Sequence, residues 1–535
     1  MKNALLVAIA AVVMSTAAIA DQPTLEELMR KIEALEERDR ERQAQIDRLE
    51  RELAGTRDEA VAEREPVTRA ERAPAESAMV ERRGPQRDPL DPSPARMRAL
   101  QLGGDASVSA GTSFNPAISV ILDGTYGYFS SDLDEPPGFD FGHGGHGHGD
   151  HGGGHGHGVG EGFNLREAEI TFSGSVDPYF DMMVMASVSS SAIELEEAYI
   201  TTSSLPAGLQ VKAGKFLSDV GYINKQHIHD WYFVDQPWMR ELMFGDEGLN
   251  ELGVQLSWLA PLPTYTRFGF EVLEGTSPGV ASFLGESRHE MVTVLPGDNN
   301  QPVRNRWRAD KNLNDKNGPR LFTGFVKWAP DLGFDHAMQL GAFGGYSRVW
   351  QNETGHSSGR LETWDGDSRF VGADLVYKYG RGGLMGQGNF VLQAEYVFRQ
   401  LDLEYQSRQF TSFSNLALTG PADDPDIRDQ KWRQDAFYVQ GVYGFAPRWN
   451  TGLRVDGVGL TNRAYDDGTD GLGRRGMRDS LGASWRYSGQ VTFAPTEFSR
   501  LRGQLSYNDF DDGHSAWQFL LQYNMSLGVH GAHAF

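Results

Sequence analysis

Residues 517–535 read WQFLLQYNMSLGVHGAHAF, and apolar and polar side chains alternate along most of this stretch. From residue 519 to residue 529 every second residue is apolar, and the residues between them are polar or small apart from Leu520. Successive side chains of a β-strand point to opposite faces of its sheet. The stretch therefore predicts a strand with one apolar and one polar face, as in a membrane barrel or at the edge of a soluble sheet.

Strand-like segments rich in aromatic residues and glycine fill the chain from about residue 98 onward. We expect sixteen strands, which begin near residues 117, 164, 179, 193, 208, 251, 264, 320, 334, 369, 390, 432, 448, 483, 498 and 515. Tight turns with proline lie at Pro178, Pro206, Pro261, Pro330, Pro447 and Pro495. Mostly long loops lie between them, at about residues 130–162, 218–250, 275–318, 347–368, 404–430 and 460–481. Short turns at one rim and long loops at the other are typical of transmembrane barrels, so residues 98–535 are predicted to form an all-β transmembrane barrel of about sixteen antiparallel strands.

The composition excludes several classes of protein. None of the 535 residues is cysteine, which rules out disulfides, thiol catalysis and cysteine-ligated metals. The 73 acidic residues outnumber the 50 basic ones and give a net charge of −23, so we expect no nucleic-acid partner. No recognisable nucleophile motif occurs, and we therefore expect neither an enzyme nor a required cofactor.

Three segments precede the predicted barrel. Residues 1–20 combine a basic Lys2, a short apolar run and the small residues Ala18 and Ala20, which is the pattern of a signal peptide removed after export. Residues 21–53 carry apolar side chains at heptad spacing, including Leu25, Leu28 and others to residue 53, and predict an α-helical coiled coil with partner copies. A solvated charged helix is the alternative. Residues 54–97 are charged and proline-rich, as expected of a linker.

This order of segments resembles the trimeric phosphate-selective porin O/P family and its relatives with an N-terminal coiled coil. The resemblance covers about residues 24–535 and includes Gly214-Lys215-Phe216 before the third long loop and the terminal aromatic residue Phe535. It implies a homotrimer in contact with the lipid of a Gram-negative outer membrane, with the coiled coil in the periplasm. It also implies that the third loop, here about residues 218–250, folds into the pore and constricts it.

The third loop is more acidic than a phosphate channel requires. Its six carboxylates and two basic side chains give a charge of −4, whereas a phosphate pore needs clusters of arginine or lysine. The candidate constriction residues are Asp219, Lys225, Asp235, Arg240, Glu241, Asp246 and Glu247. Basic residues that are expected on the inward face of the strands, such as Lys212, Arg399 and Arg502, could still form a path for anions. The structural alternative is that the loop carboxylates pair with Arg240 or with arginines of the barrel wall.

The first long loop contains a histidine-rich segment, residues 142–158, with the sequence GHGGHGHGDHGGGHGHG. Neutral imidazole is a good ligand for zinc, copper and nickel, and glycine lets the backbone wrap around an ion. The candidate metal ligands are His143, His146, His148, Asp150, His151, His155 and His157. No single set of four ligands stands out, so we expect several weak sites for Zn²⁺ or another divalent metal. A low-complexity loop without a metal is the alternative.

A second histidine pair lies in the third loop. His227 and His229 are two residues apart, which places their side chains on one side of an extended segment, and Asp230 follows directly. These three residues are a second candidate metal site, in which the carboxylate completes or orients the ligand set. Hydrogen bonding of the loop to the barrel wall is the competing interpretation.

These features together predict an outer-membrane porin for passive diffusion of small solutes, with divalent metal captured at the histidine-rich loop. That loop resembles the loops of zinc-acquiring outer-membrane proteins. Two other functions stay open. One alternative is a porin for general solutes, organic solutes or anions without a metal role. The other is an envelope tether that acts through its coiled coil.

Overall fold

The computed structural model describes residues 116–528 apart from several gaps, of which the longest are residues 140–158, 294–305 and 410–425. The chain divides into two units, Met1–Gln86 and Arg87–Phe535, and every described residue belongs to the second. The predicted signal peptide, coiled coil and linker lie outside the described residues, as do the histidine-rich segment 142–158 and the terminal Phe535.

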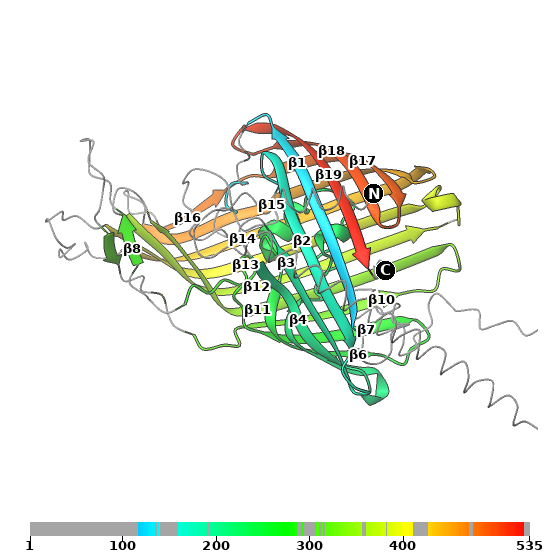
Figure 1. The fold of residues 1–535 in the computed structure, drawn as a ribbon. Coiled ribbons are helices and arrows are strands. Elements are labelled where there is room, and N and C mark those ends of the chain that lie inside the picture. The colour runs from blue at the N-terminus through cyan, green and yellow to red at the C-terminus, as the bar shows by residue number, and fades with distance from the viewer. Residues whose placement is uncertain are drawn as a thin grey trace, which may run out of the picture. The chain divides into compact units, whose positions relative to one another are not determined.

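The described strands form a closed antiparallel barrel with sixteen positions (Figure 1). The first seven positions are β1 (Ala117–Phe129), β2 (Gly162–Ser175), β3 (Phe180–Val188), β4 (Ile193–Thr202), β5 (Leu209–Leu217), β6 (Asn250–Leu259) and β7 (Tyr265–Leu273). The other nine are β10 (Leu321–Ala329), β11 (His336–Gly355), β12 (Arg360–Tyr379), β13 (Phe390–Gln409), β14 (Asp426–Ala446), β15 (Trp449–Thr469), β17 (Ser484–Thr496), β18 (Ser499–Asp509) and β19 (Ser515–Gly528). Because β1 pairs with both β2 and β19, the sheet has no open edge.

A few described elements lie outside this ring. The strand β16 (Arg475–Ser480) pairs with the end of β15 just before β17 takes over the same neighbour, so the two together fill one position. A separate hairpin consists of β8 (Glu290–Thr293) and β9 (Arg306–Ala309). The helical elements are η2 (Pro206–Gly208), η3 (Ile228–Asp230), α4 (Trp238–Phe244) and η4 (Leu384–Gly386).

None of these described helices has both the length and the apolar composition that a bilayer span requires.

The sixteen predicted strands match the observed ring, and the prediction of an antiparallel barrel is confirmed. The prediction of long loops at residues 347–368 and 460–481 is wrong, because strands β11, β12, β15 and β16 continue through most of these residues. Of the predicted loop at residues 404–430, residues 404–409 belong to β13 and residues 426–430 to β14, and residues 410–425 lie outside the described residues. A strand of 9–11 residues already crosses a bilayer, and β11 to β15 contain 20 or 21 residues each. Their outer halves need no apolar face, so apolar alternation could not reveal them.

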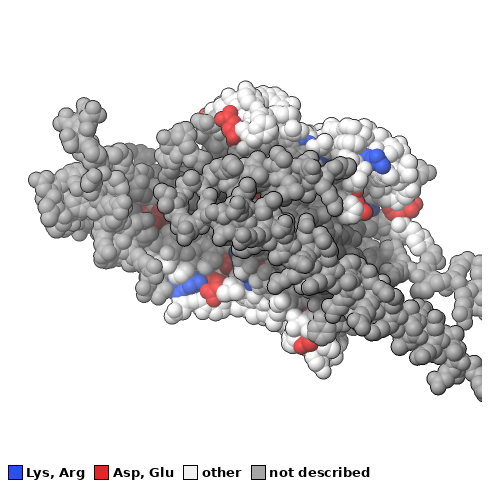
Figure 2. All heavy atoms as spheres, in the orientation of Figure 1, with Lys and Arg blue, Asp and Glu red and all other residues white. Residues whose placement is uncertain are grey.

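The two faces of the barrel wall differ in polarity, as the alternating sequence of the last strand predicts. Along β19 the apolar side chains of Phe519, Leu521 and Tyr523 are exposed, whereas those of Gln522 and Asn524 are buried toward the lumen. Figure 2 shows that most described atoms visible on one face of the molecule belong to uncharged residues. An exposed apolar exterior around a polar interior is the arrangement that suits a barrel in lipid.

Two β-bulges place additional charged side chains inside the barrel. The register of β1 and β2 shifts so that Arg166 is an extra residue beside Glu167, and both side chains are turned inward. The register of β3 and β4 shifts in the same way, with Glu196 as the extra residue beside Glu197. A bulge breaks the strict alternation of faces, so adjacent charged residues can share the lumen.

Residues 218–249 connect β5 to β6 and fold back into the barrel, and we call this segment the lumen loop. Its apolar side chains, such as Val220, Ile223, Trp231 and Met239, belong to a buried cluster together with inward residues of the wall. The short helix α4 within it begins after Pro237 and ends at Gly245, whose φ of 90° favours glycine. The lumen loop is therefore a packed part of the interior.

Because Leu521 points outward, a substitution there tests whether the exterior of the barrel contacts lipid. We expect Leu521→Lys to lower the free energy of unfolding in lipid vesicles by roughly 2–4 kcal/mol, because a charge near the bilayer midplane is costly. The control Leu521→Met keeps an apolar side chain and should cost less than about 1.5 kcal/mol. Denaturant titration in vesicles measures both changes, and equal effects would contradict a lipid-facing β19.

Candidate functional site: the lumen loop and a histidine–carboxylate cluster

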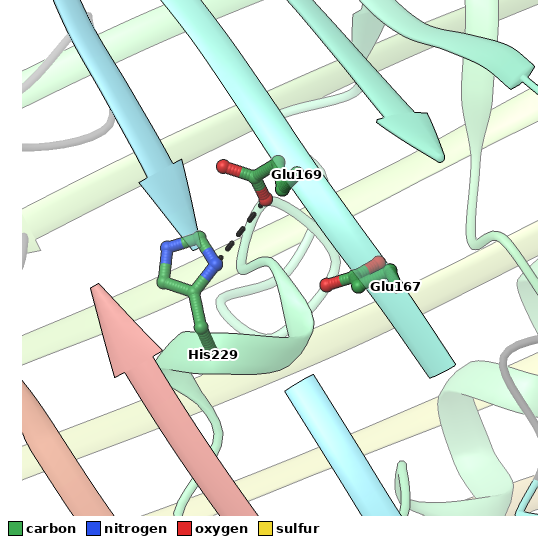
Figure 3. Close-up of side chains that lie close together, drawn as sticks. All are labelled: Glu167, Glu169 and His229. Atoms are coloured by element: carbon green, nitrogen blue, oxygen red, sulfur yellow. Dashed lines mark ion pairs between the residues drawn. The ribbon is translucent and has the colours of Figure 1, made fainter. Parts of the chain in front are cut away.

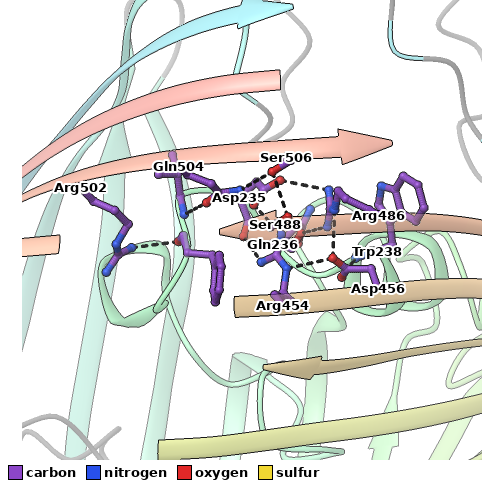
Figure 4. A network of polar contacts seen from close by, with 12 residues as sticks. Asp235, Gln236, Trp238, Arg454, Asp456, Arg486, Ser488, Arg502, Gln504 and Ser506 are labelled. Atoms are coloured by element: carbon purple, nitrogen blue, oxygen red, sulfur yellow. Dashed lines mark hydrogen bonds and ion pairs between the residues drawn. The ribbon is translucent and has the colours of Figure 1, made fainter. Parts of the chain in front are cut away.

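One side of the lumen loop is held by arginines of the barrel wall (Figure 4). Asp235 accepts hydrogen bonds from Arg454 at 2.6 Å, from Arg486 at 3.0 Å and from Gln504 at 2.7 Å. Both arginines also contact Asp456 of β15, at 2.9 and 3.0 Å. This alternating set of charges leaves each buried ion with an opposite partner, which burial requires.

The backbone of the loop is bound to a second part of the wall. The Glu395 carboxylate accepts hydrogen bonds from the backbone N–H groups of Tyr222 and Ile223, at 3.0 and 2.7 Å. Lys327 donates to the carbonyl oxygen of Gly221 at 2.9 Å. Gly221 has a φ of 66°, and a Cβ at this position would lie 2.3 Å from Glu395 Oε2, so the approach requires glycine.

The structure places the predicted constriction residues in two kinds of environment. Asp219 is buried and pairs with Arg267 at 2.9 Å, with Lys212 at 4.0 Å. Arg240 is also buried, and it donates within the loop to Gln236 and to the carbonyl oxygens of Asp246 and Glu247. The half-buried members of the set are Lys225, Asp235, Glu241, Asp246 and Glu247.

Burial and neighbouring charges shift the pKa values of two side chains of the lumen loop. Burial alone would raise the pKa of Asp235, but the charges of Arg454 and Arg486 outweigh it and lower the pKa to about 2. Burial, together with the charge of Lys327, lowers the pKa of Lys225 to about 7. The loop therefore carries a stably ionised carboxylate at one anchor and an easily deprotonated amine elsewhere.

The two loop histidines meet a group of wall carboxylates. The rings of His227 and His229 are stacked with centroids 5.9 Å apart. Figure 3 shows His229 on η3 pointing at Glu169 of β2, with a distance of 3.2 Å from Nδ1 to Oε2. Nδ1 of His227 lies 3.4 Å from Glu196 and 3.9 Å from Glu169. Both Nδ1 atoms thus face the same carboxylates.

The opposite ring nitrogens face other carboxylates. Nε2 of His227 lies 2.7 Å from Glu197 Oε1. Nε2 of His229 lies 3.8 Å from Asp230 Oδ1. Asp230, predicted as a possible ligand together with the histidines, is therefore on the far side of the His229 ring from Glu169.

Burial on its own would lower the pKa of both imidazoles. Hydrogen bonds to Glu196 and Glu197 and the charge of Glu169 outweigh burial and hold the pKa of His227 well above its usual value. The charges of Glu169 and Asp230 likewise raise the pKa of His229 to about 9. The cluster strongly favours positive charge between its carboxylates.

Sequence reasoning identified the histidines but missed their carboxylate partners on the wall. Glu167 and Glu169 are two residues apart on β2, a spacing that could have marked them as sharing a face. Glu196 and Glu197 are adjacent, and strict alternation would have sent one of them outward. Only the bulge in β4 explains why both are inside.

A cavity of about 370 Å³ adjoins this cluster. It shares Glu167, Glu196 and His227 with the cluster, and Glu194 and Glu247 add further carboxylates to its lining. Its basic lining residues are Lys215 and Arg240. The excess of carboxylates favours cations in this part of the lumen.

Comparison with known proteins identifies a sequence relative of similar length. No family model matches the chain. A protein of Aquifex aeolicus (strain VF5), described as uncharacterized, is 32% identical over 434 residues, which is 79% of this chain and 80% of the relative.

Solved outer-membrane proteins have more distant similarity. OmpT of Vibrio cholerae is 10% identical with a TM-score of 0.42, over 79% of this chain and all of that one. The outer membrane channel DcaP of Acinetobacter baumannii is 12% identical with a TM-score of 0.41, over 77% of this chain and 97% of that one. Likeness at this level assigns no function to the chain.

The anchor at Asp235 predicts a dependence of stability on pH. Its pKa falls from 3.8 in the unfolded chain to about 2 in the folded one, so its ion pairs contribute about 2 kcal/mol above pH 4. This contribution should disappear as the pH falls through 2. We expect the difference in unfolding free energy between the parent and Asp235→Asn to shrink accordingly.

The matched control is Asp335→Asn, because Asp335 is exposed in the turn before β11. Denaturant unfolding between pH 5 and pH 2 measures all three proteins. A difference between parent and Asp235→Asn that does not change over this range would contradict the low pKa of the anchor.

Proposed function

We propose that this chain, which belongs to one family with the Aquifex aeolicus protein, is a porin for passive diffusion across the outer membrane of a Gram-negative cell. The observation that carries the proposal is a closed barrel with an apolar exterior and a polar interior, into which the lumen loop folds. A loop held inside a barrel narrows the path and sets the charge that a solute meets. Diffusion through such a path requires no chemical step.

The proposal includes a homotrimer whose coiled coil, residues 21–53, lies in the periplasm. The heptad pattern supports it, because one amphipathic helix cannot bury its own apolar seam. Chemical cross-linking of the protein in membranes measures the number of copies. A ladder that ends at three chains is the expected result, and a monomer would contradict it.

A finer part of the proposal is capture of divalent metal, most favourably Zn²⁺, at residues 142–158. The described strand ends on either side of this segment, the end of β1 and the start of β2, lie at the same end of the barrel as the end of β5, where the lumen loop begins, because neighbouring strands are antiparallel. Its six histidines would raise the local concentration of metal ions at the pore mouth. Weak, multiple binding suits capture and release.

A second candidate is a channel for anions or small organic solutes without a metal role. Lys212, Arg267, Lys327 and Lys225 all act electrostatically on the carboxylate of Asp219. Glu271 and Asp374 interact with the same basic groups, so four basic side chains face three acids, an excess that favours anions locally. The reversal potential in a salt gradient separates the two candidates, since its sign reports whether cations or anions permeate faster.

We expect Zn²⁺ to change the single-channel conductance of the purified protein in planar bilayers. A variant with the six histidines of residues 142–158 changed to serine should respond more weakly, because it lacks the outer imidazoles. His336→Ser is the matched control, since His336 is exposed on β11. A conducting parent that ignores Zn²⁺ would exclude metal capture coupled to the pore. A parent without conductance would exclude the channel and favour the envelope tether.

The anchor of the lumen loop provides a separate test of constriction. We expect Asp235→Ala to raise the mean conductance or its fluctuations, because Arg454 and Arg486 lose the carboxylate that holds the loop against their wall. Asp335→Asn should behave as the parent. An unchanged conductance in Asp235→Ala, with the barrel folded, would show that this anchor does not control the narrowest part of the path.

A further inference from the structure

The cluster at the base of the acidic cavity has the donor groups of a metal site. The structure contains two sets of potential ligands, Glu167 with Glu169 and His229, and Glu169 with Glu196 and His227. Within each set the ligand atoms lie within 4.8 Å of one another. Glu169 is common to both sets. Imidazole and carboxylate together suit Zn²⁺ and other divalent ions of the first transition row.

The buried carboxylate at the centre is aimed into this site. Glu169 is 1% exposed, and its Oε1 accepts a hydrogen bond from Thr171. Its Oε2 lies at ion-pair distance from the Nδ1 atoms of the two histidines, 3.2 Å from that of His229 and 3.9 Å from that of His227, without the geometry of a hydrogen bond. A buried carboxylate oxygen is costly unless a cation or a donor satisfies it.

The far sides of the imidazole rings are arranged as in protein metal sites. A ligating histidine commonly donates its other ring N–H to a carboxylate, which fixes the tautomer and the ring orientation. Glu197 occupies this position behind His227, 2.7 Å from Nε2, whereas Asp230 lies behind His229 at 3.8 Å, beyond the length of a hydrogen bond. The Nδ1 atoms are thereby left to face Glu169 and its neighbours.

The local charges favour a cation among these carboxylates. Glu167, Glu169, Glu196 and Glu197 converge on two imidazoles. The neighbouring Arg166 is engaged with Asp123 at 2.9 Å and with a carbonyl oxygen of the lumen loop. A divalent ion would offset the repulsion among the carboxylates.

We propose that the lumen loop and the barrel wall together bind a divalent transition-metal ion, with His227 and His229 as nitrogen ligands and Glu167, Glu169 and Glu196 as oxygen ligands. Glu197 is a positioning residue that orients the His227 ring. The adjoining cavity gives the ion a route to the site from the lumen. The ion would also tie the loop to β2 and β4, away from the arginine anchor on β15 and β17. The site is independent of the histidine-rich segment and of whether the barrel conducts.

Equilibrium dialysis of the full chain with Zn²⁺ alone tests this site, with metal counted by atomic emission. All variants carry serine at the six histidines of residues 142–158, so that outer binding does not contribute. We expect this background protein to retain one tightly bound ion, or two that share Glu169. Glu169→Gln should lose the binding, because it weakens a ligand common to both sets.

The controls separate loss of ligands from loss of fold. Glu161→Gln makes the same substitution at an exposed residue just before β2 and should bind as the background does. Glu197→Gln should weaken binding by about tenfold to a hundredfold while keeping its stoichiometry, as expected for a residue hydrogen-bonded behind a ligand. Circular dichroism checks that each variant is folded.

No bound Zn²⁺ in the background protein would overturn the proposal. So would binding that Glu169→Gln leaves unchanged. Because dialysis reports binding and not permeation, either result would leave the proposed channel standing. A protein that binds Zn²⁺ but does not conduct would instead remove the channel and keep the metal site.

Discussion

The pairing of β1 with β19 is the constraint on which the rest of the structure depends. A sheet in lipid must satisfy every backbone N–H and C=O group internally, and only closure removes the unpaired edges. Closure of the ring also separates the two faces of every strand into an exterior and an interior. Since the exterior carries apolar side chains, the charged side chains of the wall gather inside or beyond the membrane.

The crowding of charge inside the barrel explains how the lumen loop is held. A loop of more than thirty residues has too few neighbours of its own to stay folded inside a wide ring, and it has to bind the wall. Asp235 meets two arginines on one side, and Glu395 accepts two backbone N–H groups on another. These contacts are charge-assisted and sheltered from water, which makes them stronger than surface ion pairs.

The sequence alone could predict the number and positions of the strands, because proline turns and apolar alternation mark each crossing of the membrane. It could not predict the outer halves of β11 to β15, where both faces are free of lipid and alternation carries no information. It identified His227 and His229 from their spacing. The carboxylates that face them come from β2 and β4, and their approach depends on strand register and on a bulge that single-sequence patterns do not encode.

The lumen loop brings opposite charges close together along its own sequence. Lys225 lies in the field of Lys327 and Arg267, whereas His227, two residues later, lies among Glu169, Glu196 and Glu197. One turn of backbone therefore borders a basic part of the wall and an acidic part. In a low-dielectric interior such a division persists over short distances, because little water is present to screen it. A charged group that reaches the loop is therefore attracted to one part or the other, and the carboxylate side is the one that carries the two imidazoles.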